Sequence, residues 1–222
     1  MINTNFSLKK NKKKFQRKSV ENFNKLITNI NKDISNSSKT LNILNRKFKF
    51  NFKIKDLKRF KKFKIVALIG MGGSILGAAA IYDFLKSKIK KKLYFFDNLD
   101  QDSIREIKQN ENLSKVLFLI ISKSGNTIET LSNAFSLGVI KKNSKNIIVI
   151  AERKNNLLFS LTKKHNLFYI EHKKHVGGRY SVLSETGVVP AYLMGLNIEK
   201  LRSNLQKFLR GKNKIILRNN VI

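Results

Sequence analysis

The chain has 222 residues, enough for one domain of ordinary size with appendages or for two small domains. Hydrophobic residues make up 41% of it, which excludes a wholly disordered chain, and the lack of cysteine excludes disulfides, a thiol nucleophile and thiolate metal sites. Lys and Arg number 46 against 14 Asp and Glu, so the net charge is +32.

This positive charge has two explanations. A nucleic-acid-binding protein would carry a clustered basic face, and its affinity for nucleic acid would fall steeply with salt. Lys, Asn, Ile and Phe are all abundant, however, and codons rich in A and T would enrich these four residue types together. Because the lysines are spread along the chain and no nucleic-acid motif is present, we expect no specific nucleic-acid partner.

Residues 1–18 are rich in lysine and are expected to form a disordered basic arm. They have no apolar stretch of the kind a secretory signal needs, and with the lack of cysteine this favours a cytoplasmic protein. A helical lead-in is expected over 19–62, with Ser19 as the N-cap of an amphipathic helix and shorter helical pieces near 40–45 and 55–62. The apolar residues of the first helix recur every three or four positions, at Val20, Phe23, Ile27, Ile30 and Ile34.

From residue 63 short apolar runs alternate with helical stretches. Strands are predicted at Lys64–Ile69, Leu93–Phe96, Lys115–Ile121, Asn146–Ala151 and Leu167–Ile170. Helices are predicted at Ser74–Lys86, Gln101–Gln109, Thr127–Lys141 and Asn156–Lys164. Runs such as "KVLFLII" are apolar throughout, so the strands should be buried on both faces in a parallel sheet. We expect a three-layer α/β domain over 63–197 and a tail over 198–222 with a helix at 198–209.

The uncharged stretch "LIGMGGSILGAAAIY" falls where the first strand meets the first helix of this domain. A membrane helix is one alternative, but four glycines interrupt the stretch, three of them close together, and lysines flank it, so we expect no membrane partner. A dinucleotide loop needs G-x-G-x-x-G, and Ile75 stands where the third glycine should be. We expect a tight turn in which Gly73 lets the backbone approach a ligand and Ser74 opens a helix that favours an anion.

A second polar stretch, "ISKSGNTIETLSNA", follows the third predicted strand. It offers the hydroxyls of Ser122, Ser124 and Thr127 and the ammonium of Lys123 at the start of a helix. These groups could serve only as a helix cap, but one residue suffices for that. Four candidate ligands at the carboxyl end of a parallel strand predict a site for a phosphate monoester.

A third stretch, "GGRYSVLSETGVVPAYLMGLN", again combines glycines with a cation. Arg179 could reach a sugar oxygen from this turn, although such a turn can also be an ordinary surface feature. Just before it, "EHKKH" places His172 and His175 three residues apart. Two lysines lie between them and no carboxylate cluster is evident, so no metal site is expected.

Taken in order, "GMGGSILG", "DNLD", "SKSGNTIET" and "GGRYSVLS" resemble motifs of the glucose-6-phosphate isomerase family. The resemblance covers about Lys64–Asn197 and corresponds to the first of the two sugar isomerase (SIS) domains of that family. It implies an aldose–ketose isomerase that interconverts glucose 6-phosphate and fructose 6-phosphate through a cis-enediol, without a metal or organic cofactor. It further implies a homodimer.

The resemblance also assigns roles to residues of this chain. Ser122, Lys123, Ser124 and Thr127 would hold the phosphate, Gly73 and Ser74 would lie beside the sugar, and Arg179 would stabilise the enediolate. The glutamate that moves the proton in the family lies in the second SIS domain, and this chain ends at Ile222. We expect the carboxylates near the motifs to be structural or solvated, and these are Glu129, Glu171 and Glu185.

Two functions follow from this resemblance. The first is a glucose-6-phosphate isomerase whose chain lacks the C-terminal half. This chain would then pair with a separate polypeptide that supplies that half, and the resemblance does not say whether the chain is active alone. The alternative is a non-catalytic SIS module that binds a sugar phosphate and regulates another process.

Overall fold

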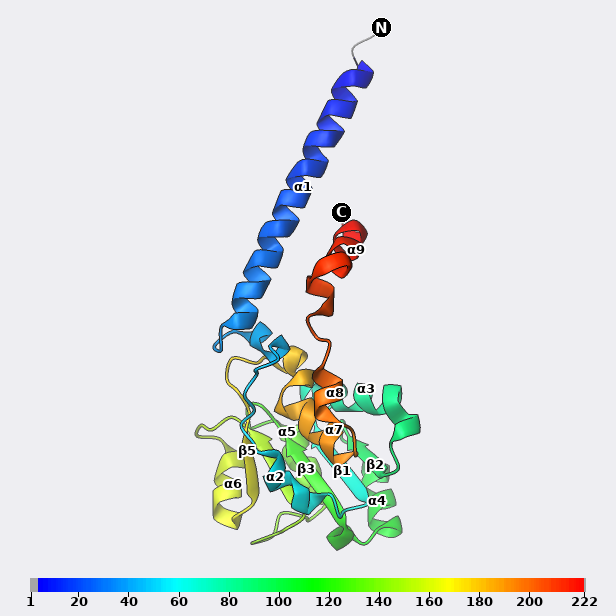
Figure 1. Cartoon of the computed structure of the whole chain (residues 1–222). Coiled ribbons are helices and arrows are strands. Elements are labelled where there is room, and N and C mark those ends of the chain that lie inside the picture. The colour runs from blue at the N-terminus through cyan, green and yellow to red at the C-terminus, as the bar shows by residue number, and fades with distance from the viewer. Residues whose placement is uncertain (1–3, 222) are drawn as a thin grey trace. The chain divides into compact units, whose positions relative to one another are not determined.

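The computed structural model describes the backbone of residues 4–221 and the side chains of residues 15–221 (Figure 1). It divides into two compact units, one containing Met1–Phe48 with Arg202–Ile222 and the other containing Lys49–Leu201. The expected helical lead-in, 19–62, is therefore shared between the two units. Within residues 4–221 no helix is both long enough and apolar enough to cross a membrane.

In the first unit, helix α1 spans Thr4–Ser35, so the prediction that Ser19 caps its start is wrong. Most of the expected disordered arm, residues 4–18, is helical, and residues 1–3 lie outside the described part. The reason is that the segment has no Gly or Pro to stop a helix, and Lys, Arg and Gln have good helix propensity. The predicted apolar stripe is confirmed at three buried positions, Phe23, Ile27 and Ile34.

The end of α1 is fixed by hydrogen bonds from the segment that follows. Asn42 Nδ2 donates to the Ile34 carbonyl at 2.7 Å, from the short 3-10 helix η1 (Thr40–Leu44).

The C-terminal segment contacts η1 through Arg202. Arg202, at the end of α8 (Ile198–Arg202), donates to the Ile43 carbonyl at 2.7 Å. The single tail helix predicted at 198–209 is instead broken, and η7 (Lys207–Leu209) and α9 (Gly211–Val221) follow.

The second unit is built on a five-stranded sheet in the order β2-β1-β3-β4-β5, and all the paired strands are parallel. The strands are β1 (Ile65–Gly70), β2 (Lys92–Phe96), β3 (Val116–Ile121), β4 (Ile147–Ala151) and β5 (Phe168–Glu171). Every residue of β3 and β4 is buried. The predicted α/β fold is confirmed, and each strand begins and ends within one residue of its expected bounds.

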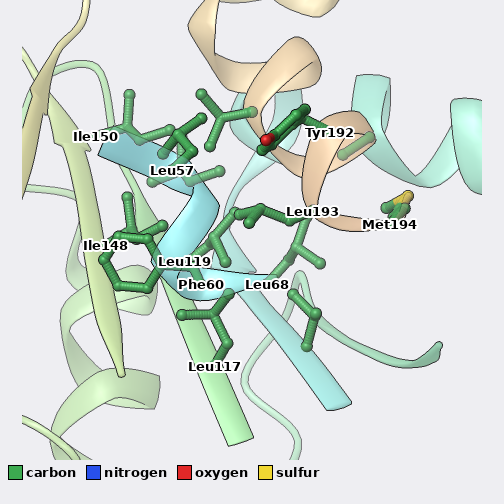
Figure 2. Close-up of a cluster of buried hydrophobic side chains, with 14 of the residues drawn as sticks. Leu57, Phe60, Leu68, Leu117, Leu119, Ile148, Ile150, Tyr192, Leu193 and Met194 are labelled. Carbon is green, nitrogen blue, oxygen red and sulfur yellow. The ribbon is translucent and has the colours of Figure 1, made fainter. Parts of the chain in front are cut away.

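Helices cover both faces of this sheet, as an apolar strand requires. One face packs against α2 (Ile54–Leu57), η2 (Lys58–Phe60), α3 (Leu76–Leu85) and α7 (Glu185–Leu193) through one core cluster, part of which is shown in Figure 2. The other face packs against α4 (Gln101–Asn110), α5 (Ile128–Ser136) and α6 (Leu157–His165). Short 3-10 helices at Gly72–Ser74 (η3), Lys86–Lys88 (η4), Leu113–Lys115 (η5) and Gly178–Leu183 (η6) complete the unit.

Helix α7 was not predicted from the sequence. All nine of its residues are buried, so it has no polar face to produce a helical period, and Pro190 lies inside it. In Figure 2 Leu193, the last residue of α7, lies beside Leu68 and Leu119 of the sheet, and Tyr192 belongs to the same core cluster. This buried helix supports the segment that carries Arg179, because η6 runs directly into it.

Candidate functional site

The sheet order sets the position of the site. The chain moves from β1 outward to β2 and then back across to β3, so β1 and β3 are neighbours whose connections leave in opposite directions. Open α/β sheets bind ligands in the crevice outside the carboxyl ends of two such strands. Gly70 and Ile121, the last residues of β1 and β3, are paired in register. A Cβ at Gly70 would lie 2.9 Å from the Ile121 carbonyl oxygen, so the two strand ends are in close contact.

Three hydroxyls gather in the loop that follows β3, which we call the hydroxyl loop and define as residues 122–127. Ser122 Oγ and Thr127 Oγ1 are 2.8 Å apart, and Ser124 Oγ lies 3.3 Å from Thr127 Oγ1 and 3.4 Å from Ser122 Oγ. Ser122 is buried, Thr127 is half-buried and Ser124 is exposed. The cluster therefore reaches from the end of the strand to the surface, and its hydroxyl hydrogens can rotate toward a bound anion.

Capping does not account for this cluster. Thr127 is the N-cap of α5, yet its side chain makes no capping hydrogen bond and instead contacts the hydroxyls of Ser122 and Ser124. The Thr127 side chain therefore does not cap the amides in the first turn of α5, although three hydroxyls lie beside that turn. Amide groups at a helix start favour an anion, which agrees with the expected phosphate position.

The start of α6 packs against the hydroxyl loop and supports it. Gly125 has a φ of +72°, and a Cβ there would overlap the side chain of Asn156. Asn156 caps α6 by accepting from the Phe159 amide at 2.9 Å, and the Leu158 amide donates to the Gly125 carbonyl at 3.0 Å. The Leu157 amide donates to Asn126 Oδ1 at 2.8 Å. Sequence reasoning missed this supporting role, although "KNNL" before an apolar run is typical of a helix start.

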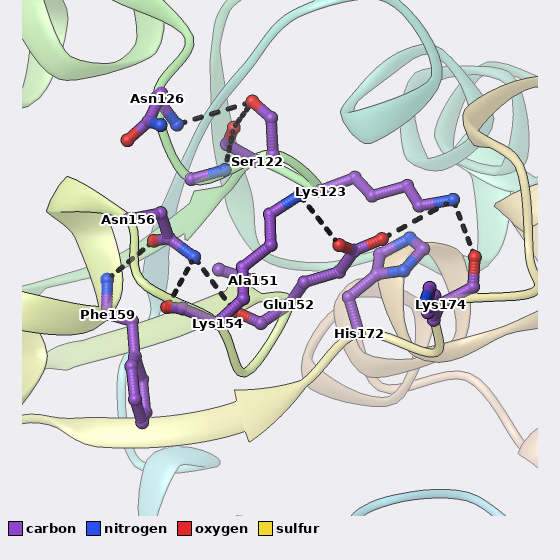
Figure 3. Close-up of polar contacts among 12 residues, drawn as sticks. Ser122, Lys123, Asn126, Ala151, Glu152, Lys154, Asn156, Phe159, His172 and Lys174 are labelled. Atoms are coloured by element: carbon purple, nitrogen blue, oxygen red, sulfur yellow. Dashed lines mark hydrogen bonds and ion pairs between the residues drawn. The ribbon is translucent and has the colours of Figure 1, made fainter.

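The ammonium of Lys123 takes part in a separate polar cluster (Figure 3). Lys123 Nζ donates to the Lys174 carbonyl at 2.9 Å and lies 3.6 Å from Glu152 Oε1, and Lys154 Nζ lies 2.9 Å from Glu152 Oε2. Burial opposes ionisation of Glu152, but the hydrogen bond and charge of Lys154 and the charge of Lys123 outweigh it, so its pKa is below the usual value. Glu152 is therefore an ionised carboxylate shared by two lysines.

The two glycine stretches pack against each other. A Cβ at Gly73 would overlap the backbone of Gly178, so η3 and η6 touch through their glycines. Ser181 Oγ, 2.7 Å from the Gly178 carbonyl oxygen and 3.0 Å from that of Gly73, can donate to either. Arg179, which follows Gly178, is exposed, and Ser74 is half-buried. The structure thus brings the predicted residues Gly73, Ser74 and Arg179 into one region.

Hydroxyls further along the third stretch have internal roles. Ser184 Oγ and Thr186 Oγ1 both donate to the Ser181 carbonyl, at 2.7 and 2.8 Å, and both residues are buried. Glu185 is fully buried and its Oε1 accepts from the Asn51 amide at 2.9 Å. This agrees with the expectation that Glu185 is structural. Glu129 and Glu171 are half-buried.

Comparison with known proteins decides the family. The family model of phosphoglucose isomerase matches residues 18–216. The chain belongs to the phosphoglucose isomerase family. A glucose-6-phosphate isomerase of Methanocaldococcus jannaschii is 32% identical over 165 residues, which is 73% of this chain and 41% of that protein. Another, of Borreliella afzelii, is 39% identical over 167 residues, 69% of this chain and 30% of that protein. The chain therefore spans less than half the length of these relatives.

Solved structures show the same fold. A hypothetical protein of Thermus thermophilus aligns with a TM-score of 0.69 at 20% identity, over 92% of this chain and 54% of the other. A glucose-6-phosphate isomerase of Chlamydia trachomatis aligns with a TM-score of 0.54 at 24% identity, over 72% of this chain and 31% of the other. These alignments agree with the SIS-type sheet predicted from the sequence.

The histidines near the site are not grouped as metal ligands. His172 is buried, its Nδ1 lies 3.0 Å from the Lys173 carbonyl oxygen, and burial lowers its pKa. Burial also lowers the pKa of His175, with smaller effects from Lys173 and Lys123. Among the described residues, His, Asp and Glu side chains do not form a group of three that could hold a metal ion.

Proposed function

We propose that this member of the phosphoglucose isomerase family binds a hexose 6-phosphate and provides the phosphate-binding half of a glucose-6-phosphate isomerase. One observation carries the proposal: Ser122, Ser124 and Thr127 converge at the start of α5, beside the carboxyl ends of β1 and β3, whose connections leave in opposite directions. That crevice is where an α/β sheet of this order binds its ligand.

The phosphate would be held by the hydroxyl loop and the first turn of α5. A charge-assisted hydrogen bond contributes about 1.5–3 kcal/mol, and a helix N-terminus adds about 0.3–1 kcal/mol. Three hydroxyl contacts are therefore enough for specific binding of a monoester dianion. Lys123 lies within this loop and adds positive charge to it.

The sugar would extend from the phosphate toward the η3–η6 contact. Gly73 and Ser74 would lie beside it, and the exposed guanidinium of Arg179 would stabilise the negative charge that develops on the enediolate oxygen. Isomerisation also moves a proton between two carbons, which requires a general base. Glu185 is buried against Asn51 and does not serve this purpose. We propose that a segment corresponding to the part of the relatives that this chain does not span supplies the base. The active enzyme would be cytoplasmic, and it would form either as a homodimer or by pairing of this chain with a second chain that carries the missing half.

Two measurements test this function. The first is conversion of fructose 6-phosphate to glucose 6-phosphate by this chain together with a polypeptide that supplies the remaining length of its relatives. We expect turnover by the pair. Binding of fructose 6-phosphate to this chain without turnover by the pair would instead support the non-catalytic SIS module.

The second measurement is calorimetric titration of the chain with inorganic phosphate and with fructose 6-phosphate. Thr127→Val removes one hydroxyl of the cluster and should weaken both ligands about tenfold, equivalent to about 1.4 kcal/mol. Thr162→Val is the matched control, because that buried hydroxyl donates only to the Leu158 carbonyl within α6. An absence of phosphate binding by the unmodified chain would contradict the proposal.

A further inference from the structure

Lys123 joins two segments that are far apart in the sequence. Its backbone extends the β3–β4 pairing, since the Glu152 amide donates to the Lys123 carbonyl at 3.1 Å. Its side chain then passes Glu152 and reaches the Lys174 carbonyl at 2.9 Å, beyond the end of β5 (Figure 3). The hydroxyl loop is thus connected through Lys123 to the segment 172–181.

That segment carries Arg179, and it is fixed at both ends. At its beginning the Lys174 carbonyl accepts from Lys123 Nζ. At its end Ser181 Oγ lies 3.0 Å from the Gly73 carbonyl oxygen, and Gly178 and Gly73 are in backbone contact. Each anchor comes from one of the two loops that border the crevice. The backbone that carries Arg179 therefore depends on both.

Glu152 holds the Lys123 side chain along this path. Only 12% of the Glu152 side chain and 32% of the Lys123 side chain are exposed, so water screens their interaction incompletely. Moving the ammonium to a phosphate would break the hydrogen bond to Lys174 and lengthen the ion pair with Glu152. Lys154 would then be the remaining cation on that carboxylate, and its side chain is 52% exposed.

From this geometry we propose that Lys123 is a positioning residue for Arg179. Its ammonium ties the segment 172–181 to the hydroxyl loop and does not bind the phosphate directly, and Glu152 keeps it in place. The consequence for isomerisation rests on the proposed function, because it assumes that Arg179 acts on the sugar. The tether itself is a property of the described residues and can be tested without turnover.

The test is amide hydrogen exchange of the full chain, followed by mass spectrometry of peptides that cover 172–183. In Lys123→Ala, amides from Lys174 to Arg179 should exchange about tenfold faster, since a charge-assisted hydrogen bond to their backbone is lost. Glu152→Gln should show a smaller increase in the same peptides. Lys154→Ala is the matched control, because it pairs with the same carboxylate from outside the hydroxyl loop, and it should leave their exchange unchanged. Lys123→Arg should restore protection, since a guanidinium can reach both partners.

Measuring phosphate affinity distinguishes a Lys123 that positions the segment 172–181 from a Lys123 that contacts the phosphate directly. Lys123→Ala should change the Kd for inorganic phosphate by less than about threefold, and in the reconstituted pair it should lower kcat more than it raises KM. A Kd raised tenfold or more with unchanged exchange would overturn the proposal and assign the ammonium to the phosphate. If exchange responds as expected while the unmodified chain binds neither phosphate nor fructose 6-phosphate, the tether stands and the proposed function fails.

Discussion

Two glycines with similar backbone angles differ in the space around them. Gly125 has a φ of +72° and Gly138 a φ of +67°, a conformation that costs other residues about 1–2 kcal/mol. A Cβ at Gly138 meets nothing within 4 Å, whereas one at Gly125 would overlap the Asn156 side chain. Substitution of these two glycines can therefore separate the contribution of close packing to stability from that of backbone conformation.

We expect Gly138→Ala to lower the free energy of unfolding by about 1–2 kcal/mol through its backbone strain alone. Gly125→Ala should cost a further 1–3 kcal/mol, roughly the penalty for overpacking, and should weaken phosphate binding because the hydroxyl loop must shift. Urea unfolding and phosphate titration measure the two effects. Equal losses of stability in the two variants would show that Asn156 does not constrain the loop.

Buried His172 makes stability depend on pH in the acid range. Its pKa is lowered by burial first and also by the charges of Lys123 and His175, while Glu152 and the hydrogen bond to the Lys173 carbonyl act in the opposite direction. Below the unfolded-state pKa of 6.5 the unfolded chain therefore binds a proton that the folded chain excludes. The free energy of unfolding should fall as the pH drops from 6.5, by at most about 1.4 kcal/mol per pH unit for this group.

His172→Gln should flatten this dependence between pH 6.5 and 5 relative to the unmodified chain. Denaturant unfolding at a series of pH values checks it. His175→Gln should flatten the dependence less, because His175 is less deeply buried than His172. An unchanged slope in His172→Gln would mean that the folded chain accepts the proton on this histidine.

At the scale of elements, α6 both packs on the sheet and supports the hydroxyl loop. Asn156→Ala removes the cap on Phe159 and the hydrogen bond from Nδ2 to the Glu152 carbonyl. Loss of a cap of this kind costs about 1–2 kcal/mol, and phosphate affinity should fall as well because the loop loses its support. Asp100→Ala is the control, since it removes the cap of α4 and leaves the hydroxyl loop untouched. Equal phosphate affinities in the two variants would contradict this role of Asn156.

The elements with a clear hydrophobic pattern could be predicted from the sequence. Strands β3 and β4 are apolar on both faces, and this pattern located them within one residue. Helix α7 is buried on every side and has no period to detect. Helix α5 ends at Ser136 instead of the predicted Lys141, because Gly138 adopts a positive φ close to its end.

The site was predictable as far as its local motifs go. Hydroxyls within six consecutive residues, such as Ser122 and Thr127, can be seen in the sequence to share one loop. The partners of Lys123 at Glu152 and Lys174 lie 29 and 51 positions away. Contacts of this range depend on which strand ends adjoin, and the sheet order decides that.

At the scale of the whole molecule, 46 Lys and Arg against 14 Asp and Glu give a net charge of +32. At the site itself, Lys123 of the hydroxyl loop lies 3.6 Å from Glu152 Oε1. The surrounding positive field favours the approach of any anion, which would aid a phosphorylated sugar without selecting it. Selection then depends on the short-range hydroxyl contacts at the strand ends.

The boundaries of the phosphate-binding unit can be tested by cutting the chain. The sheet, both core clusters and all three ligand stretches lie within Lys49–Leu201. A chain of residues 49–201 should unfold cooperatively and keep its Kd for phosphate within about twofold. A chain of residues 63–197, the domain expected from the sequence, lacks Leu57 and Phe60, which are 0% and 1% exposed against the sheet. Removing two such side chains costs about 3–6 kcal/mol, so this shorter chain should be largely unfolded. Equal stability of the two chains would show that α2 and η2 are not part of the unit.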